Sequence, residues 1–275
     1  MAIKIGSGVA STQFGPRQLA KAQQTSQEHL ARLSSGLRLL SAADDSASLA
    51  ISQDMRADLR GIDRAAQNAN DGVSVAQVAD GALQEIGGML SRLRELSTQA
   101  ANGTLNDEQR SIIDKEFQAI KTEISRVVET TEFNGTRLID GSSEGISIQV
   151  GGDAGEENRI EINIENSDTT ALGLGSAGIS GEADARSSIA SVHVAIDRLS
   201  ERRVGVGTAQ NRLEGSLRNL SASRVNLEAS RSRIEDADLA QEVSALAASN
   251  IRSQMSVAMQ AQANVAAGLS LSLIG

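Results

Sequence analysis

Residues 239–275 read LAQEVSALAASNIRSQMSVAMQAQANVAAGLSLSLIG, and only Glu242 and Arg252 among them are charged. The apolar residues of this stretch recur mostly at steps of three and four, which is the spacing of a helix with one apolar stripe. The predicted stripe consists of Leu239, Val243, Leu246, Ile251, Met255, Ala258, Val265 and Leu269. A single helix has nothing against which to bury such a stripe, so the stretch requires a partner.

A lipid bilayer is the first partner to consider, because residues 253–275 carry no charge and are long enough to span one. Ser, Gln and Asn side chains are nevertheless scattered around this helix. Hydrocarbon penalises polar side chains that it surrounds. We therefore expect a protein partner and no membrane insertion.

A second apolar pattern lies near the other end of the chain. Its residues step by three, four and three, and they are Leu30, Leu33, Leu37 and Leu40. Residues 1–43 carry a net charge of +4 and residues 236–275 a net charge of −2, so a modest attraction favours pairing of the two ends. Residues 1 to about 16 are rich in Gly and Ser, and we expect them to be disordered in a free monomer.

Between the two ends, the apolar spacing predicts three more helices. The first runs to about residue 101, and the capping-box spacing of Ser41-Ala-Ala-Asp44 predicts its start. Asn106 and Gln109 have the same spacing at the start of the second helix. The third runs from about residue 183 to residue 234.

The period of the pattern changes after Asn134-Gly135, which closes the second of these helices. Apolar residues then alternate with polar ones at Ile146–Val150 and again at Ile160–Ile164. A Gly-rich segment, residues 151–158, separates the two runs. This arrangement predicts a β-hairpin with a long loop.

Composition excludes several classes of function. The net charge of −9 argues against nucleic-acid binding, which needs a basic face. The chain has no Cys, its two histidines, His29 and His193, lie far apart, and most carboxylates accompany Arg or Lys at helical spacing. We expect no enzymatic activity, no metal and no cofactor. The N-terminal residues contain no continuous apolar segment, so no secretory signal peptide is predicted.

Short motifs along the chain point to one family. They are Leu33-Ser-Ser-Gly-Leu-Arg38, Ser41-Ala-Ala-Asp-Asp45, Asn68-Ala-Asn-Asp-Gly72, Glu132-Phe-Asn-Gly135, Gln210-Asn-Arg212 and Ser232-Arg-Ile-Glu-Asp-Ala-Asp238. Their order and sequence resemble those of the bacterial flagellins, and the resemblance covers nearly the whole chain.

The resemblance implies a mainly α fold, a long antiparallel helical bundle or coiled coil in which the N- and C-terminal helices are paired. Residues 1–45 and 236–275 would form a terminal coiled-coil domain inside the filament. Residues 46–235 would form a helical-bundle domain with a β-hairpin near residues 144–165. Most flagellins insert variable outer domains before the last long helix, but the equivalent gap here, residues 175–184, is too short for a domain.

The function implied by the resemblance is that of a structural subunit, which self-assembles into the bacterial flagellar filament and serves swimming motility. Flagellins are exported unfolded by the flagellar type III apparatus without a cleaved signal peptide, and they polymerise outside the cell at the distal tip. The implied partners are other copies of the chain, an export chaperone on the C-terminal segment, the filament cap and hook-associated proteins. The alternative is a hook–filament junction protein, which shares flagellin-like ends.

The resemblance also implies a contact with an innate immune receptor. Flagellins that activate Toll-like receptor 5 contact it through an Arg, a Leu four residues later and a Glu on the next helix. The matching residues of this sequence are Arg92, Leu96 and Glu116. The same surface would be buried between subunits in the filament, so recognition would require free monomer.

Overall fold

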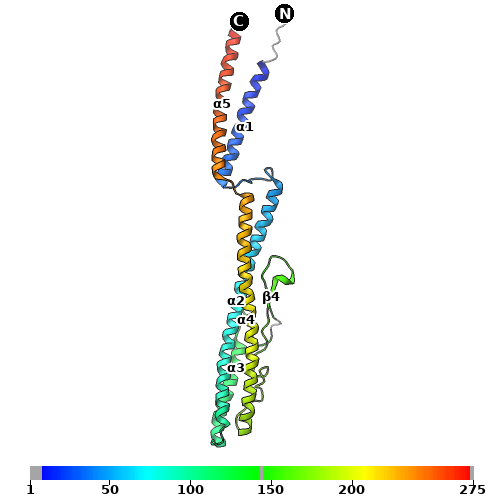
Figure 1. Ribbon diagram of the computed structural model, residues 1–275, viewed down its shortest axis with the longest axis vertical. Helices are drawn as coiled ribbons and strands as arrows, with labels where there is room; N and C mark the ends of the chain where they lie inside the picture. The colour runs from blue at the N-terminus through cyan, green and yellow to red at the C-terminus, as the bar shows by residue number, and fades with distance from the viewer. Residues whose placement is uncertain (1–7, 143–144, 273–275) are drawn as a thin grey trace. The chain divides into compact units, whose positions relative to one another are not determined.

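The computed structural model describes residues 8–142 and 145–272 (Figure 1). Its α-helices are α1 (Gly8–Ser35), α2 (Ser46–Ala100), α3 (Asp107–Thr130), α4 (Glu182–Glu235) and α5 (Leu239–Ser272). The strands form two antiparallel pairs, β1 (Glu132–Phe133) with β2 (Thr136–Arg137) and β3 (Ile146–Gln149) with β4 (Arg159–Ile162), and a 3-10 turn, η1 (Glu156–Asn158), precedes β4. The predicted mainly α fold with a small β-hairpin is confirmed.

The chain divides into two compact units. One contains the described residues up to Ala57 and those from Asn226 onward, and the other is Asp58–Val225. The predicted boundaries near residues 45 and 236 separate the inner layer of a filament from the next layer. They are not the boundaries of these two units, and they stay a prediction.

The unit Asp58–Val225 has a continuous apolar core built from three helices, the β3–β4 hairpin and the segments on either side of that hairpin. Its largest fully buried side chains are Leu83, Ile86, Leu90, Leu93, Leu96, Phe117, Ile124, Leu138, Ile139, Ile162, Leu172 and Leu174. The predicted apolar spacing of α3 is confirmed, because Phe117 and Ile124 are both fully buried. This unit therefore has the kind of core that stabilises a domain without help from a partner.

The ends of the helices in this core are held by specific polar groups. Asn106 and Gln109 form the predicted capping box at the start of α3, with the Asn106 side chain accepting from the Gln109 amide at 2.8 Å. Arg110 was not predicted to matter, yet its buried guanidinium donates from Nε to the carbonyl of Ala100 at 3.0 Å and from Nη2 to that of Asn102 at 3.2 Å. It thus donates to the last carbonyl of α2 and to a carbonyl just beyond the end of that helix.

The predicted hairpin is confirmed, and the structure gives its register. Ile146 pairs with Ile162 and Ile148 with Ile160. It packs against α2 at Gly72, where a Cβ atom would lie 3.0 Å from Ile148 Cγ1. Gly72 therefore permits a close approach that any larger residue would disturb.

Two local predictions were incomplete or wrong. Asn134-Gly135 does more than close α3, because it forms the two-residue turn between β1 and β2, with φ of 51° and 78°. Positive φ at both positions matches the twist of a tight hairpin, and Asn-Gly is its common sequence. The start of α2 lies later than predicted, because Ser41 and Asp44 do not begin the helix, which starts at Ser46. Asp44 accepts from the amide of Ser41 at 3.0 Å, whereas Asp45 accepts from Ser48 at 3.1 Å and so caps the helix at Ser46.

These hydrogen bonds also affect the two carboxyl groups. The pKa of Asp44 is lowered chiefly by the hydrogen bond from the Ser41 amide, and the pKa of Asp45 chiefly by that from the Ser48 hydroxyl. Both groups therefore favour the folded state when they are ionised. Their contribution is present above the unfolded-state pKa and is lost as the pH falls through the folded-state pKa.

Helix α1 begins at Gly8 and thus enters the segment that we expected to be disordered. Residues 1–7 lie outside the described residues. The local content of Gly and Ser is a weak predictor of disorder where a helix can extend from a longer helical segment.

Matched substitutions in α3 test the core of the second unit. Ile124→Ala and Ile112→Ala remove the same atoms, but Ile124 is fully buried and Ile112 is 63% exposed. We expect the first change to lower the free energy of unfolding by about 2–5 kcal/mol and the second to change it by less than about 0.5 kcal/mol. Urea unfolding followed by circular dichroism measures both. Equal effects would contradict the assignment of Ile124 to the core.

Candidate assembly surface

Helices α1 and α5 lie side by side and antiparallel (Figure 1). The predicted pairing of the N- and C-terminal helices is therefore confirmed. The side of α5 that is wholly or partly buried recurs at heptad steps, and its residues are Glu242, Ala245, Leu246, Ser249, Ser253, Ser256 and Gln260. Apart from Leu246, these residues are small or polar. Small side chains allow two helices to approach closely, but they bury little apolar area.

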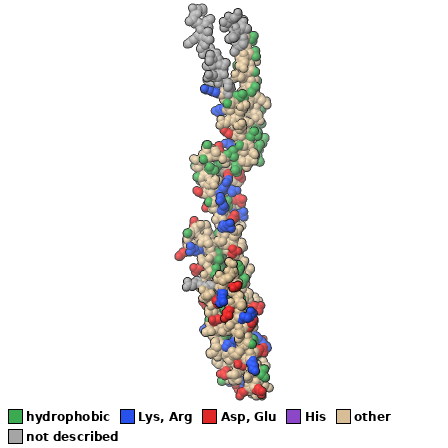
Figure 2. Space-filling view, turned by 180° about the vertical axis from the view of Figure 1, so that it is seen from behind, with side chains coloured by type: hydrophobic (Ala, Val, Ile, Leu, Met, Phe, Trp, Pro, Cys, Tyr) green, Lys and Arg blue, Asp and Glu red, His purple; other side chains and the backbone are tan. Residues whose placement is uncertain are grey.

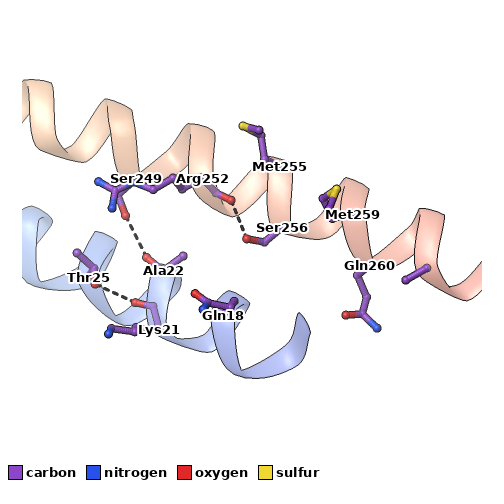
Figure 3. Close-up of a pocket in the computed structure, with 11 residues that line it drawn as sticks. Gln18, Lys21, Ala22, Thr25, Ser249, Arg252, Met255, Ser256, Met259 and Gln260 are labelled. Carbon is purple, nitrogen blue, oxygen red and sulfur yellow. Dashed lines mark hydrogen bonds between the residues drawn. The ribbon is translucent and has the colours of Figure 1, made fainter. Parts of the chain in front are cut away.

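Hydrogen bonds replace apolar contacts along much of this interface. Ser249, which is 2% exposed, donates its hydroxyl to the carbonyl of Ala22 at 3.1 Å (Figure 3). One turn away, the Ser26 hydroxyl donates to Asn250 Oδ1 at 3.1 Å. Each bond contributes about 0.5–1.5 kcal/mol net, so the interface is specific without being strong.

An ionic cluster lies in the first turn of α5. His29 Nδ1 lies 2.6 Å from Glu242 Oε2, and Arg32 Nη1 lies 3.7 Å from Glu242 Oε1. The His29 and Glu242 side chains are mostly buried. The contact aligns the two helices in register, and it explains why one of the only two charges in the C-terminal stretch lies on the α1 side. His193 does nothing comparable, because it lies exposed 3.8 Å from Asp197.

The predicted apolar stripe of α5 faces away from α1. Ala258 is exposed, only Leu246 is partly buried, and the other side chains are between 51% and 62% exposed, namely Leu239, Val243, Ile251, Met255, Val265 and Leu269. Figure 2 shows hydrophobic side chains gathered along this helix. Within one chain, the stripe therefore does not pack on the leucines of the N-terminal end, and its burial against neighbouring subunits stays a prediction. The small residues, not the large ones, occupy the intramolecular interface.

The predicted apolar pattern Leu30–Leu40 does not form one continuous helical stripe, because the helix ends within it. Helix α1 ends at Ser35, and Gly36 has a φ of 71° with its amide bonded to the Arg32 carbonyl at 2.8 Å. Leu37 and Leu40 therefore lie beyond the helix, while Leu30 is 51% exposed and Leu33 is partly buried. A glycine immediately after a helical segment is a known stop signal, and it could have located this end from the sequence.

The connections α1–α2 and α4–α5 run side by side. The amide of Arg38 donates to the carbonyl of Glu235 at 2.7 Å, and the amide of Ala237 donates to that of Gly36 at 2.9 Å. Between them, Leu37 and Asp236 form an antiparallel bridge. These bonds tie the segment that follows the end of α1 to the segment that precedes the start of α5.

Glu235 is the buried anchor of this joint. Its side chain is 3% exposed and forms ion pairs with Arg56 and with Arg231, the second at 3.7 Å. A buried carboxylate needs such partners, because an unpaired charge in this position would be strongly destabilising. Sequence reasoning missed this residue, although it lies inside a quoted motif. Nothing in its local pattern distinguishes it from the exposed carboxylates around it.

Toward the chain ends, α1 and α5 border a groove of about 720 Å³ (Figure 3). Its lining combines apolar, polar and basic side chains, including Gln18, Lys21, Thr25, Arg252, Met255 and Met259. The described residues contain no group of three or more His, Cys, Asp or Glu side chains able to hold a metal ion. Among the described helices, none is both long and apolar enough to cross a membrane.

The three predicted receptor-contact residues lie in the unit Asp58–Val225, on α2 and α3. Arg92 donates from Nη2 to Glu116 Oε1 at 2.8 Å and from Nη1 to Glu95 at 2.9 Å. The hydrogen bond to Glu116 is the main cause of the raised pKa of Arg92. Arg92 and Glu116 are each about half exposed, but Leu96 is 1% exposed and belongs to the core. The Leu96 side chain therefore cannot contact a partner while the bundle is folded, and the receptor site stays a prediction for the ion pair.

Comparison with known proteins identifies the family. Residues 10–144 match the bacterial flagellin N-terminal helical region, and residues 189–273 match the bacterial flagellin C-terminal helical region. A flagellin from Halalkalibacterium halodurans is 40% identical over 240 residues, which cover 86% of this chain and 88% of that protein.

Two solved structures resemble the fold. Bacillus cereus flagellin matches with a TM-score of 0.51 and 31% sequence identity, over 56% of this chain and 88% of that one. A putative flagellar hook-associated protein from Vibrio parahaemolyticus matches with a TM-score of 0.59 over 70% of this chain and 100% of that one, but at 13% identity this likeness shows the fold alone. The two matched regions and the identity over most of the chain show that this protein belongs to the bacterial flagellins.

Proposed function

We propose that this chain is the structural subunit of a flagellar filament, and that other copies of the chain cover the apolar face of α5. The main observation that supports this proposal is the exposed apolar stripe of α5. Leu239, Val243, Ile251, Met255 and Val265 are each more than half exposed on one helix. A contiguous apolar stripe of this kind marks an interaction site, whereas single exposed apolar residues do not.

The free energy available from this face is large enough to drive assembly. Burying a Leu, Ile, Val or Met side chain contributes about 1.5–3 kcal/mol. Five side chains that are half exposed would together contribute on the order of 4–8 kcal/mol per subunit before the entropy of association. Repetition along a helical polymer adds further contacts for every subunit.

The same features support export in an unfolded state followed by ordering on assembly. Within one chain, α1 and α5 meet through small and polar side chains, so their pairing alone stabilises the terminal segments little. A segment of this kind orders when a partner covers it, and the partner's binding supplies the missing stability. Residues 1–45 and 236–275 then form the inner filament domain and residues 46–235 the next layer.

The remaining partners follow from this role. The subunit leaves the cell through the flagellar type III apparatus without a cleaved signal peptide, with a chaperone covering its C-terminal segment until export. The filament cap and hook-associated proteins are its contacts at the filament ends. The chain has a structural role and catalyses no reaction.

A hook–filament junction protein is the second candidate, because such proteins share flagellin-like ends. Adding purified monomer to filament seeds distinguishes a filament subunit from a junction protein. A filament subunit elongates the seeds without limit, whereas a junction protein stops after a few subunits, as electron microscopy would show.

The exposed pair Arg92–Glu116 is the proposed contact for Toll-like receptor 5. Its two charges are held at a fixed spacing on neighbouring helices, and a partner can hydrogen-bond to both. Leu96 supports this surface from the core and makes no direct contact.

Substituting the apolar face tests the assembly role. Ile251→Ser should slow seed elongation at least about tenfold, because it removes apolar area that a neighbour buries. Ile112→Ser is the matched control, since Ile112 is similarly exposed on α3 in the other unit. We expect a smaller effect there, about threefold or less. If Ile251→Ser elongates at the normal rate, α5 does not present the assembly face.

The intramolecular interface has its own test. Ser249→Leu places a large side chain where α1 and α5 meet, which should weaken their pairing by about 1–3 kcal/mol. Ser244→Leu, at an exposed position of the same helix, is the control. Because the chain contains no Cys, spin labels at Gln23→Cys and Ala247→Cys report the distance between the helices. The distance distribution should broaden only for Ser249→Leu, and a response from both variants would contradict the interface.

The receptor contact is tested with single substitutions in the ion pair. Arg92→Ala and Glu116→Ala should each weaken activation of a receptor reporter by monomer about tenfold. Arg126→Ala is the control, because Arg126 forms a similar exposed ion pair with Glu123 on α3. Activation by the Arg92 and Glu116 variants that equals that of the unsubstituted monomer would remove this site.

A further inference from the structure

Two methionines of α5 are unusually accessible. Met255 is 62% exposed and Met259 is 71% exposed, and they lie one helical turn apart at the edge of the groove (Figure 3). Met55 and Met89 are partly buried, and Met1 lies outside the described residues. Exposure therefore separates one pair of thioethers from the others that the structure describes.

The position of the pair makes its chemical state important. Met255 belongs to the apolar stripe, and Met259 extends that stripe by one turn on the groove side. Methionine is a flexible apolar side chain that suits a contact surface. Any modification that makes these two side chains polar changes the face that we assign to neighbouring subunits.

Peroxides carry out such a modification. The thioether sulfur attacks one oxygen of hydrogen peroxide, the O–O bond breaks, and an S–O bond forms. The sulfur is oxidised by two electrons and the peroxide is reduced to one molecule of water, so no further reactant is needed. The product, methionine sulfoxide, is polar, and sulfoxide reductases convert it back to methionine.

We propose that Met255 and Met259 form a reversible oxidation site that determines whether a subunit can join the filament. This inference rests on the proposed function. Sulfoxide oxygens must lose their hydration when a neighbour covers α5, and an apolar contact offers them no hydrogen bond. The cationic side chains of Lys21 and Arg252 line the same groove, and they can donate to a sulfoxide in the free monomer. Both effects favour the monomer over the assembled state.

Assembly also protects the site. The two methionines are accessible in the monomer and become covered once a neighbour occupies α5. Oxidation therefore acts before incorporation, and it excludes damaged subunits without dismantling filaments that already exist.

The test treats monomer with millimolar hydrogen peroxide and follows each methionine by peptide mass spectrometry. Met255 and Met259 should gain one oxygen each at least five times faster than Met55 and Met89. Elongation of filament seeds by the treated monomer should fall at least fivefold, and treatment with the two sulfoxide reductases should restore it. Equal oxidation of all four methionines, or full elongation by monomer oxidised at both positions, would overturn the proposal.

Substitutions test whether Met255 and Met259 cause the loss of elongation after peroxide treatment. The double variant Met255→Leu and Met259→Leu, normalised to its own untreated elongation rate, should lose sensitivity to peroxide. Met55→Leu should keep it, and the reverse result would overturn the proposal. Untreated, unsubstituted monomer is the separate test of the proposed function, because its failure to elongate seeds would reject the filament role itself.

Discussion

The close packing of α5 on α1 through small and polar side chains is the constraint on which the rest of the terminal unit depends. Ser249 and its neighbours let the helices approach, and their hydrogen bonds and the His29–Glu242 contact set the register. A helix that turns its small residues inward must turn its large ones outward. The apolar stripe of α5 is therefore available to other copies of the chain because of how the chain pairs with itself.

The two units use opposite strategies for stability. Asp58–Val225 buries Leu, Ile and Phe side chains from three helices and caps its helix ends with Asn106 and Arg110. The terminal unit has few buried apolar side chains, and its charged anchor at Glu235 holds the two connections together. A stable bundle combined with weakly held ends suits a subunit whose ends gain their stability from neighbours.

The sequence predicted much of this fold because helical and strand periods are local properties. The apolar spacing of α3, its capping box and the alternating Ile residues of the hairpin could all be predicted from the sequence. The errors arose where two local signals competed. Ser41–Asp44 has the spacing of a capping box although Asp45 caps the helix, and Asn134-Gly135 both follows a helix and forms a hairpin turn. The buried Glu235 had no local signal, since its burial results from residues far away in the chain.

Periodicity and motifs were sufficient to identify the helices, the paired ends and the family, because each depends on residue types at fixed spacing. The choice of which face of α5 meets α1 was not contained in that pattern. Both faces have heptad spacing, and the larger apolar residues made the wrong one look like the seam. The tertiary structure decided which face is buried, because small side chains let the two helices approach closely, and that fit exists only between two folded helices.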